Sequence, residues 1–325
     1  MHLYIASSHD PYYNLAVENW LFREVFTGEP ILYLWQNTPC VVIGRAQNPW
    51  RECNIHALNK DNIPIVRRQS GGGTVFHDMG NINYTIISSS EDYNKRKNLD
   101  TIIQVLAEAD IKAHVSERND ILLRHQNNDY KISGSAFRET KDRAFQHGTL
   151  LVNTNTDKLY HYLHHKIDDN LNTKGVHSHR SKVMNLKAVH PDIDINTIIQ
   201  AFLNNFNKHI TYLPSDLTHN SIIQEILMLQ TWQWRYGKTL PFERSFDIEG
   251  DEVSLQIKNG HIHALDAKEQ YHMLATWIHQ HKPIYDQASF QKVLSSFDPA
   301  SNKLAKIFFD VIPNVFKVSD YADTK

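Results

Sequence analysis

The chain of 325 residues is long for a single domain and comfortable for two. Hydrophobic residues make up 41% of it and charged residues 22%, which is ordinary for a globular protein. Its 34 Lys and Arg against 36 Asp and Glu leave a formal charge of -2. This balance argues against a protein that coats nucleic acid or an anionic membrane, so neither partner is expected.

The only cysteines are Cys40 and Cys53, too few for a disulfide framework or a cysteine-based zinc site. A reducing compartment is the simplest explanation for so few cysteines. The first ten residues have no basic stretch followed by an apolar run, so no signal peptide is predicted. No apolar run approaches the roughly 20 residues that span a bilayer. We therefore expect a cytoplasmic protein.

Helix and strand signals are intermixed in the first half of the chain. Asp10-Pro11 predicts a helix start, because an N-cap carboxylate precedes proline, and this helix should end near Gly28. Further helices are expected at 51–60 and 99–110. The expected strands are 31–35, 40–44, 63–68, 74–77, 83–88, 113–115, 120–124, 131–136 and 149–153. Without strict strand–helix alternation, this order predicts an α+β fold with a mixed, largely antiparallel sheet and packed helices.

The second half begins with a polar, weakly patterned stretch at 172–185, which we expect to be a long loop. Asn259-Gly260 predicts a hairpin, because this dipeptide suits a two-residue turn between strands. We expect a large domain at residues 1–243 and a small α+β C-terminal domain at 244–325. The other expected elements are helices 195–210 and 220–234, a linker at 236–243, hairpin strands 252–258 and 261–265, and helices 268–281, 287–296 and 301–312.

The first candidate site is the run RRQSGGGTVFHD at residues 67–78. Three consecutive glycines let backbone approach a ligand closely, because no side chain intervenes. Arg67 and Arg68 supply forked donors suited to phosphate or carboxylate oxygens. No Gly-Lys-Ser/Thr closes the run, so it is not a P-loop. Taken alone, the run is equally typical of a flexible turn with solvated arginines.

The second candidate site is KISGSA at residues 131–136, followed by HGTL at residues 147–150. A lysine that opens a strand of small residues can direct its ammonium into a cleft, while Gly134 keeps the wall thin. Asp120 precedes a strand, where its carboxylate suits Mg2+ or an adenosine group. A surface lysine and a turn-forming aspartate are the alternatives for these two residues.

Several segments of the chain share motifs with one known family. Residues 67–81 match the pattern RRxSGGGxVFHDxGN, and residues 131–150 are similar to KxSGSAxxxxxxxxxHGTL. Residues 13–18 (YNLAVE), 41–53 (VVIGRAQNPWREC) and 174–186 (KGVHSHRSKVMNL) look like its first helix, next signature and adenylate-binding loop. Together they resemble lipoate–protein ligase A in its bacterial two-domain form, within the biotin/lipoate ligase superfamily. Beyond residue 245 the resemblance lies in architecture more than in motifs.

The resemblance implies roles for individual residues and makes 1–243 the catalytic domain. Lys131 would be the catalytic residue and would contact both the α-phosphate of ATP and the lipoate carboxylate. Ser70 would also contact lipoate, and Asp120 would be a Mg2+ ligand. The ATP-binding set would be Arg68, Gly73, Thr74, Val75, Phe76 and Lys131, and the weaker candidates are Asp120, Ser135, His147, Arg180 and Lys182.

The reaction implied is an acid–amine ligation that salvages lipoate. ATP and Mg2+ would activate lipoate to lipoyl-AMP, because a carboxylate does not acylate an amine at neutral pH. The acyl group would then pass to the ε-amine of a lysine on an acceptor protein. The implied acceptors are lipoyl domains of 2-oxoacid dehydrogenase acyltransferase subunits and the glycine-cleavage H protein. The sequence leaves open the preferred acceptor, lipoate versus octanoate, the oligomeric state and the extent of C-terminal domain rotation.

Three other functions are alternatives to this one. An octanoyl or lipoyl transferase on the same scaffold commonly uses a cysteine nucleophile, and both cysteines here precede the glycine run. A biotin ligase would carry a glycine-arginine motif that this chain lacks. A non-catalytic lipoate-binding module would not require Arg68, Lys131 and Asp120 together. The histidines between residues 161 and 179 are better explained as exposed residues of a helix and a loop than as ligands of a metal ion.

Replacing Cys40 and Cys53 together by serine tests the transferase alternative. We expect ATP-dependent acylation to stay near the wild-type rate, apart from a packing cost, because no thiol takes part in ligation. The measurement is the mass of the acceptor domain over time. Complete loss of activity in a folded double variant, or a trapped thioester, would favour the transferase.

Overall fold

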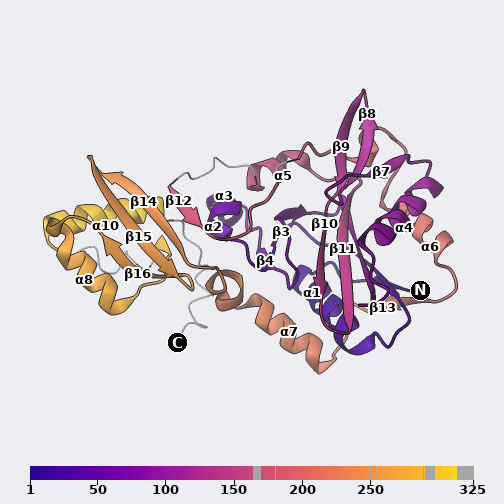
Figure 1. Cartoon of the computed structure of the whole chain (residues 1–325), viewed down its shortest axis with the longest axis horizontal. Coiled ribbons are helices and arrows are strands. Elements are labelled where there is room, and N and C mark those ends of the chain that lie inside the picture. Colours follow the sequence, from indigo (N-terminus) through magenta and orange to yellow (C-terminus); the bar gives the residue numbers. More distant parts are fainter. Residues whose placement is uncertain (164–169, 180, 249, 288, 290–296, 313–325) are drawn as a thin grey trace.

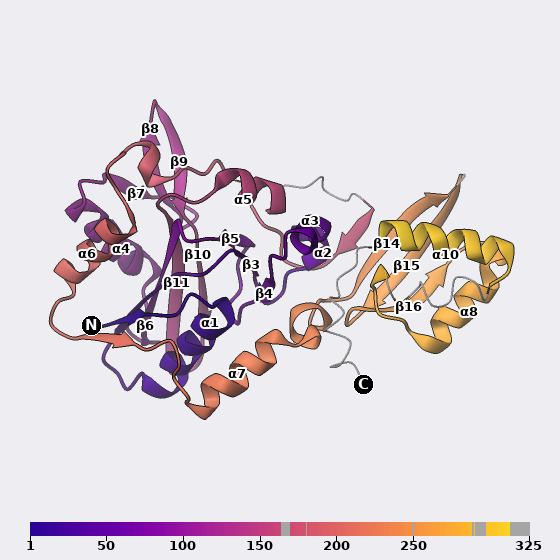
Figure 2. The ribbon, with the colours of Figure 1, turned by 180° about the vertical axis from the view of Figure 1, so that it is seen from behind.

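The computed structural model describes residues 1–163, 170–179, 181–248, 250–287, 289 and 297–312 of the chain (Figure 1). The molecule is elongated, with a large lobe that carries the N-terminus and a small lobe at the other end. Figure 2 shows the same arrangement from behind, with α7 running along one side of the large lobe toward the junction. Among the described residues, no helix is long and apolar enough to cross a membrane.

The large lobe is built on a six-stranded mixed sheet. The strand β1 is parallel to both of its neighbours, and the remaining pairs are antiparallel. The order is β10 (Ser135–Glu139), β11 (Arg143–Leu151), β6 (Asn81–Ser89), β2 (Ile31–Trp35), β1 (His2–Ala6) and β13 (Ile210–Leu213). The predicted mixed, largely antiparallel sheet with packed helices is therefore confirmed.

Helices cover both faces of this sheet, and the alternation of strand residues decides which core each face joins. Leu32 and Leu34 pack with one helix pair, and Ile31, Tyr33 and Trp35 pack with the other. The first pair is α4 (Lys95–Glu108) and α6 (Ile195–Asn205), and the second is α1 (Pro11–Trp20) with the helical turn η1 (Leu21–Val25) and α7 (Asn220–Gln230).

Two three-stranded sheets and short helices complete the large lobe. One sheet has the order β4, β3, β5, and the other has the order β7, β8, β9. Their bounds are β3 (Cys40–Ile43), β4 (Ile65–Arg67), β5 (Val75–His77), β7 (Ala113–Val115), β8 (Ile121–His125) and β9 (Asn128–Ser133). The short helical elements are α2 (Pro49–Glu52), α3 (Ile55–Lys60), α5 (Thr156–Leu163), η2 (Leu186–Ala188) and η3 (Gln233–Gly237).

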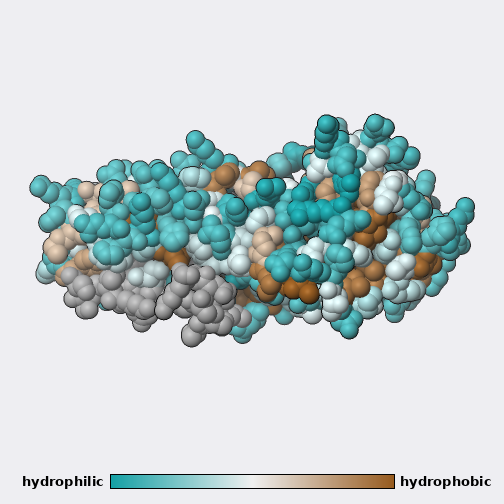
Figure 3. Space-filling view, turned by 90° about the horizontal axis from the view of Figure 1, so that it is seen from below, coloured by the Kyte–Doolittle hydropathy of each residue, from teal (hydrophilic) through white to brown (hydrophobic). Residues whose placement is uncertain are grey.

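The small lobe packs helices against a four-stranded antiparallel sheet. The predicted hairpin is confirmed, because Asn259 and Gly260 have φ of 51° and 73°, as its two-residue turn requires. Its elements are β12 (Leu171–Thr173), β14 (Phe242–Ile248), β15 (Asp251–Lys258), β16 (His261–Asp266), η4 (Glu269–Tyr271), α8 (His272–His281) and α10 (Pro299–Val311). The face in Figure 3 is mostly hydrophilic, with hydrophobic residues in separate patches.

Several predicted elements differ from the structure. The helix expected at 51–60 is two helices, because Asn48 and Asn54 each cap a new helix start. The strand expected at 131–136 divides at Gly134 into β9 and β10, which belong to different sheets. The helix expected at 195–210 ends at Asn205, since Ile210 begins β13.

The junction between the lobes also differs from prediction. The expected loop 172–185 begins inside β12, which pairs with β14, and β14 itself begins inside the expected linker. The boundary at 243 and 244 stays a prediction. The strand β1 was not predicted, and most of the helix expected at 287–296 lies outside the described residues.

Arg67 connects the glycine run to the lobe junction, a role that the sequence did not predict. Its side chain is fully buried, and burial lowers the pKa of the guanidinium to about 10. The Arg67 carbonyl accepts from Trp234 Nε1 at 2.7 Å. Its guanidinium donates to the carbonyls of Gly44, Arg45, Gln47, Trp234 and Arg235 and to the Thr239 hydroxyl, over 2.8 to 3.3 Å.

Replacing Arg67 by lysine should lower the free energy of unfolding by about 3 kcal/mol or more. An ammonium has three donors, so several of the buried acceptors would lose their partner. Urea denaturation followed by circular dichroism measures the loss. Arg45→Lys, at an exposed position, is the control and should stay within about 0.5 kcal/mol of wild type. Equal stability of the two variants would contradict the role of Arg67.

Candidate functional site

The main cavity is a hollow of about 290 Å3 in the large lobe. Its walls come from the glycine run, from the β9–β10 junction, from the end of β11 and from residues 176–179. A second cavity, of about 90 Å3, shares Thr74, Val75 and Lys131 with the first and also includes Phe76. Segments far apart in sequence therefore meet at Lys131.

Arg68 holds the glycine run in a fixed conformation. Its guanidinium is 4% exposed and donates to the carbonyls of Gly71 at 2.5 Å and Gly73 at 2.7 Å. Burial lowers the pKa of this guanidinium to about 10. Gly72 has φ of 82°, and a Cβ there would lie 2.9 Å from the Cβ of Ala136. The run is thus a fixed turn pressed against β10, and Arg68 lines the main cavity while it braces that turn.

Lys131 and Asp120 form an ion pair on the cavity wall. Lys131 Nζ lies 2.9 Å from Asp120 Oδ1, and the side chains are 24% and 19% exposed. A Cβ on Gly134 would lie 2.9 Å from Lys131 Cε and 3.0 Å from Nζ. The expectation that Gly134 keeps the wall thin beside the ammonium fits this geometry. Ser135 lines the same wall, and its hydroxyl donates to the Asn119 carbonyl at 3.0 Å.

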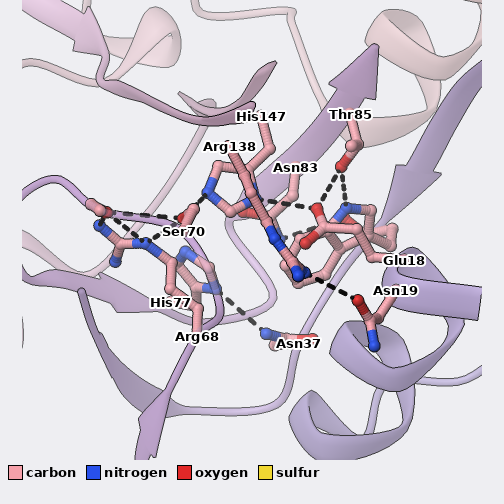
Figure 4. Close-up of polar contacts among 12 residues, drawn as sticks. Glu18, Asn19, Asn37, Arg68, Ser70, His77, Asn83, Thr85, Arg138 and His147 are labelled. Atoms are coloured by element: carbon pink, nitrogen blue, oxygen red, sulfur yellow. Dashed lines mark hydrogen bonds and ion pairs between the residues drawn. The ribbon is translucent and has the colours of Figure 1, made fainter. Parts of the chain in front are cut away.

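A chain of buried polar groups lies behind the inner end of the cavity (Figure 4). Glu18 Oε1 is 2.8 Å from His147 Nδ1 and accepts from the Thr85 hydroxyl at 2.6 Å. Because the Glu18 carboxylate only accepts, His147 Nδ1 carries a hydrogen. His147 Nε2 then lies 2.8 Å from the Ser70 hydroxyl, which also accepts from Arg68 Nε at 2.9 Å. The chain connects α1 and β11 to the glycine run.

His77 also lines the cavity, from the end of β5. Its Nδ1 lies 3.1 Å from Asn37 Nδ2, whereas its Nε2 has no hydrogen-bond partner among the described residues. Burial, followed by the charges of Arg68 and His147, lowers the pKa of His77 to about 3. The imidazole is therefore neutral at physiological pH, and Asn37 directs its hydrogen to Nε2.

The structure brings most of the predicted site residues together. Ser70 does not line the cavity but lies behind it, 1% exposed, and Lys182 contributes its carbonyl, which accepts from Lys131 N at 2.9 Å. Arg180 lies outside the described residues. The predicted residues on the main cavity are Arg68, Gly73, Thr74, Val75, Asp120, Lys131, Ser135 and His147.

The sequence did not assign Glu18, Gln47, Trp35, His77 or Ser178 to the site. All of them except Trp35 stand in the quoted motifs, which is the one signal that points to them. No group of three or more potential metal-ligating side chains is found in the described part of the chain. The Mg2+ role of Asp120 therefore stays a prediction.

This chain is similar to a known protein family and to several solved structures. Residues 10–207 match the model of the lipoyl protein ligase A/B catalytic domain. The chain belongs to this family. The resemblance to lipoate–protein ligases drawn from the motifs is confirmed.

Solved structures share the fold of this lipoyl protein ligase family member at low identity. P. falciparum LipL1 in complex with lipoate is 23% identical, with a TM-score of 0.61, and the match covers 95% of this chain and 99% of that one. A bipartite lipoate protein ligase from Thermoplasma acidophilum, described with its E2 lipoyl domain, is 23% identical with a TM-score of 0.58. That match covers 72% of this chain and 95% of the other. A lipoate-protein ligase A bound with ATP is 24% identical with a TM-score of 0.57. That match covers 72% of this chain and 97% of the other. These matches confirm the expected α+β fold.

Replacing Glu18 by leucine should lower the free energy of unfolding by about 2 to 4 kcal/mol. Both the Thr85 hydroxyl and His147 Nδ1 would lose their buried acceptor. Glu18→Gln keeps an acceptor oxygen and should lose at most about half as much. Thermal and urea unfolding of the two variants measure the difference. Equal losses would show that the carboxylate oxygen is not what the chain of polar groups depends on.

Proposed function

We propose that this protein is an ATP-dependent lipoate–protein ligase. It activates lipoate to lipoyl-AMP and transfers the lipoyl group to a lysine ε-amine on an acceptor protein, as an acid–amine ligase of lipoate salvage. The observation that carries the proposal is the position of Lys131. Its ammonium lies on the wall shared by two cavities, beside the glycine run and against Gly134.

The first step joins the lipoate carboxylate to the α-phosphate of ATP. The carboxylate oxygen attacks phosphorus and pyrophosphate leaves, which converts a poor leaving group into AMP. Negative charge gathers on the phosphoryl oxygens during this displacement, and Lys131 offsets it. The rigid turn braced by Arg68 presents backbone from Gly73 to Phe76 to the nucleotide. Ser70, behind the wall, would act on lipoate through His147.

Asp120 is the residue proposed to bind Mg2+. Mg2+ at nucleotide sites is commonly bound by one or two carboxylates together with substrate phosphates, so a single carboxylate on the wall fits this role. A Mg2+ ion held there would supply positive charge to offset that of the phosphates. Asp120 also holds Lys131 at 2.9 Å, which keeps the ammonium at the cavity.

In the second step the acceptor lysine attacks the acyl carbonyl, and AMP leaves. Lys131 stabilises the developing oxyanion. The proposed acceptors are lipoyl domains of 2-oxoacid dehydrogenase acyltransferase subunits and the glycine-cleavage H protein. The proposal includes a catalytic domain at 1–243, an accessory domain at 244–325 and a cytoplasmic location, which two free cysteines support. The solved relatives with lipoate, ATP and an E2 lipoyl domain support the same substrates and partner.

The state of the cysteines favours ligation over cysteine-dependent acyl transfer. Cys40 and Cys53 are 0% and 2% exposed, and neither lines the main cavity in the described part of the chain. Burial raises the pKa of both thiols well above the usual range, so the nucleophilic thiolate is disfavoured.

The test of the proposal is a reaction with lipoate, ATP-Mg2+ and a lipoyl domain, followed by weighing the domain. We expect a gain of one lipoyl group that requires ATP and is accompanied by AMP. A mass gain without ATP would support a transferase. Lipoate binding with no mass gain at all would support a binding module.

Lys131→Ala should abolish both adenylate formation and transfer, because its charge is used in both steps. Lys131→Arg should also fail substantially, since a planar guanidinium does not fit the wall beside Gly134. Pyrophosphate release and acceptor mass report the two steps separately. Unfolding curves of both variants control for stability. Retention of a tenth or more of the wild-type rate by Lys131→Ala would rule out this role.

A further inference from the structure

In the segment Lys174–His179, the residues Val176 to His179 form part of the wall of the main cavity. Ser178 connects this segment to the glycine run. Its hydroxyl oxygen accepts from Thr74 N at 2.9 Å and from Gln47 Nε2 at 3.0 Å. Two donors from different parts of the chain therefore converge on one side-chain oxygen of the segment.

Gln47 is fixed in the orientation that this contact needs. Its Oε1 accepts from the Gly44 backbone N–H and from the Thr74 hydroxyl, each at 2.9 Å. Because a backbone N–H only donates, Oε1 must face Gly44, and the amide nitrogen must face Ser178. Gln47 is fully buried, so it stays in this orientation while the segment is in place.

The main chain of Ser178 is held as well. Its N–H donates to Glu52 Oε2 at 3.2 Å, and Glu52 is 8% exposed. His177 Nδ1 lies 3.8 Å from the other oxygen of the same carboxylate. A Cβ on Gly73 would lie 3.3 Å from Ser178 Oγ, so glycine at that position lets the hydroxyl reach Thr74. Side chain and backbone of Ser178 thus both bind to the large lobe.

We propose that Ser178 is a positioning residue that keeps the segment closed over the activated acyl group, so that the acceptor amine reacts in place of water. This inference rests on the proposed ligase function. In the wasteful reaction, the oxygen of water attacks the acyl carbonyl, the bond to the phosphate oxygen breaks, and AMP and lipoate leave with a proton. In ligation, the lysine nitrogen makes the same attack, an amide forms, and AMP and a proton leave.

Removing the hydroxyl changes the balance between these two reactions. Thr74 N–H and the Gln47 amide would lose their acceptor, and water would replace it at the cavity wall. Since one net hydrogen bond shifts a closed–open equilibrium by about three- to ten-fold, open states become that much more frequent. Closed active sites exclude water from reactive intermediates, so opening raises hydrolysis more than it lowers activation.

The experiment compares wild type with Ser178→Ala, Ser178→Thr and Ser215→Ala, using lipoate, ATP-Mg2+ and a lipoyl domain. The readout is the number of AMP molecules released for each domain acylated, together with AMP release when the domain is omitted. Ser215 is the control, because its side chain is exposed and it lines neither cavity in the described part of the chain. Threonine restores the hydroxyl.

We expect Ser178→Ala to raise AMP release without acceptor, and AMP per acylated domain, by about three-fold or more. Ser178→Thr and Ser215→Ala should give the wild-type ratio. An unchanged ratio in Ser178→Ala overturns the inference, and so does a parallel fall in AMP and product, which would place Ser178 in activation. A threonine variant that behaves like alanine also overturns it. If wild type forms no ATP-dependent AMP or product, the proposed function itself fails.

Discussion

The buried guanidinium of Arg67 is the interaction on which the rest of the structure depends. It lies at the end of β4, directly before the glycine run, and donates to oxygens of two segments almost two hundred residues apart, Gly44–Gln47 and Trp234–Thr239. All six of these acceptors are neutral, so the charge is stabilised by peptide and hydroxyl dipoles and is costly to bury. Arg67 is buried where three parts of the molecule meet. These are the sheet of β3 and β4, the turn after β3 and the start of the small lobe. A single side chain thereby fixes the base of the site.

Above this base, polar groups bind mainly to one another, which leaves few of them for a ligand. Arg68 is bonded to Ser70, Gly71 and Gly73, and His147 uses both ring nitrogens, on Glu18 and Ser70. These side chains are therefore held in fixed positions, as preorganised sites require. Lys131, partly exposed and paired with Asp120, keeps its ammonium at the surface of the cavity. Buried charges therefore set the geometry of the site, whereas Lys131, Asp120 and Arg118 are accessible charges on the cavity wall.

Short-range signals predicted much of this molecule, and long-range hydrogen bonds explain what they missed. The Asn259-Gly260 turn, the strands β2 and β6 of the large sheet and the position of Lys131 beside Gly134 follow from local chemistry and motif spacing. Arg67 and Arg68 were predicted as phosphate forks, yet both bind protein oxygens. The partners of Arg67 come from residues 44–47 and 234–239, which no local pattern reveals. The same limit applies to β12, whose three residues form a strand only because β14 lies beside them. The contact of Ser178 with Thr74 likewise joins positions 104 residues apart.

The pairing of β12 with β14 has a mechanical consequence. Thr173 is paired with Phe242 in the small-lobe sheet, and Ser178 is bonded to Thr74 in the large lobe, with only Lys174 to His177 between them. A chain of this length spans at most about 3.5 Å per residue, so it works as a short tether with little slack. A large rotation of the small lobe would therefore break either the pairing of β12 with β14 or the hydrogen bond between Thr74 and Ser178. The position of the small lobe is therefore coupled to the segment that lines the main cavity, and an insertion or deletion at Lys174 or Gly175, which do not line it, would lengthen or shorten this tether.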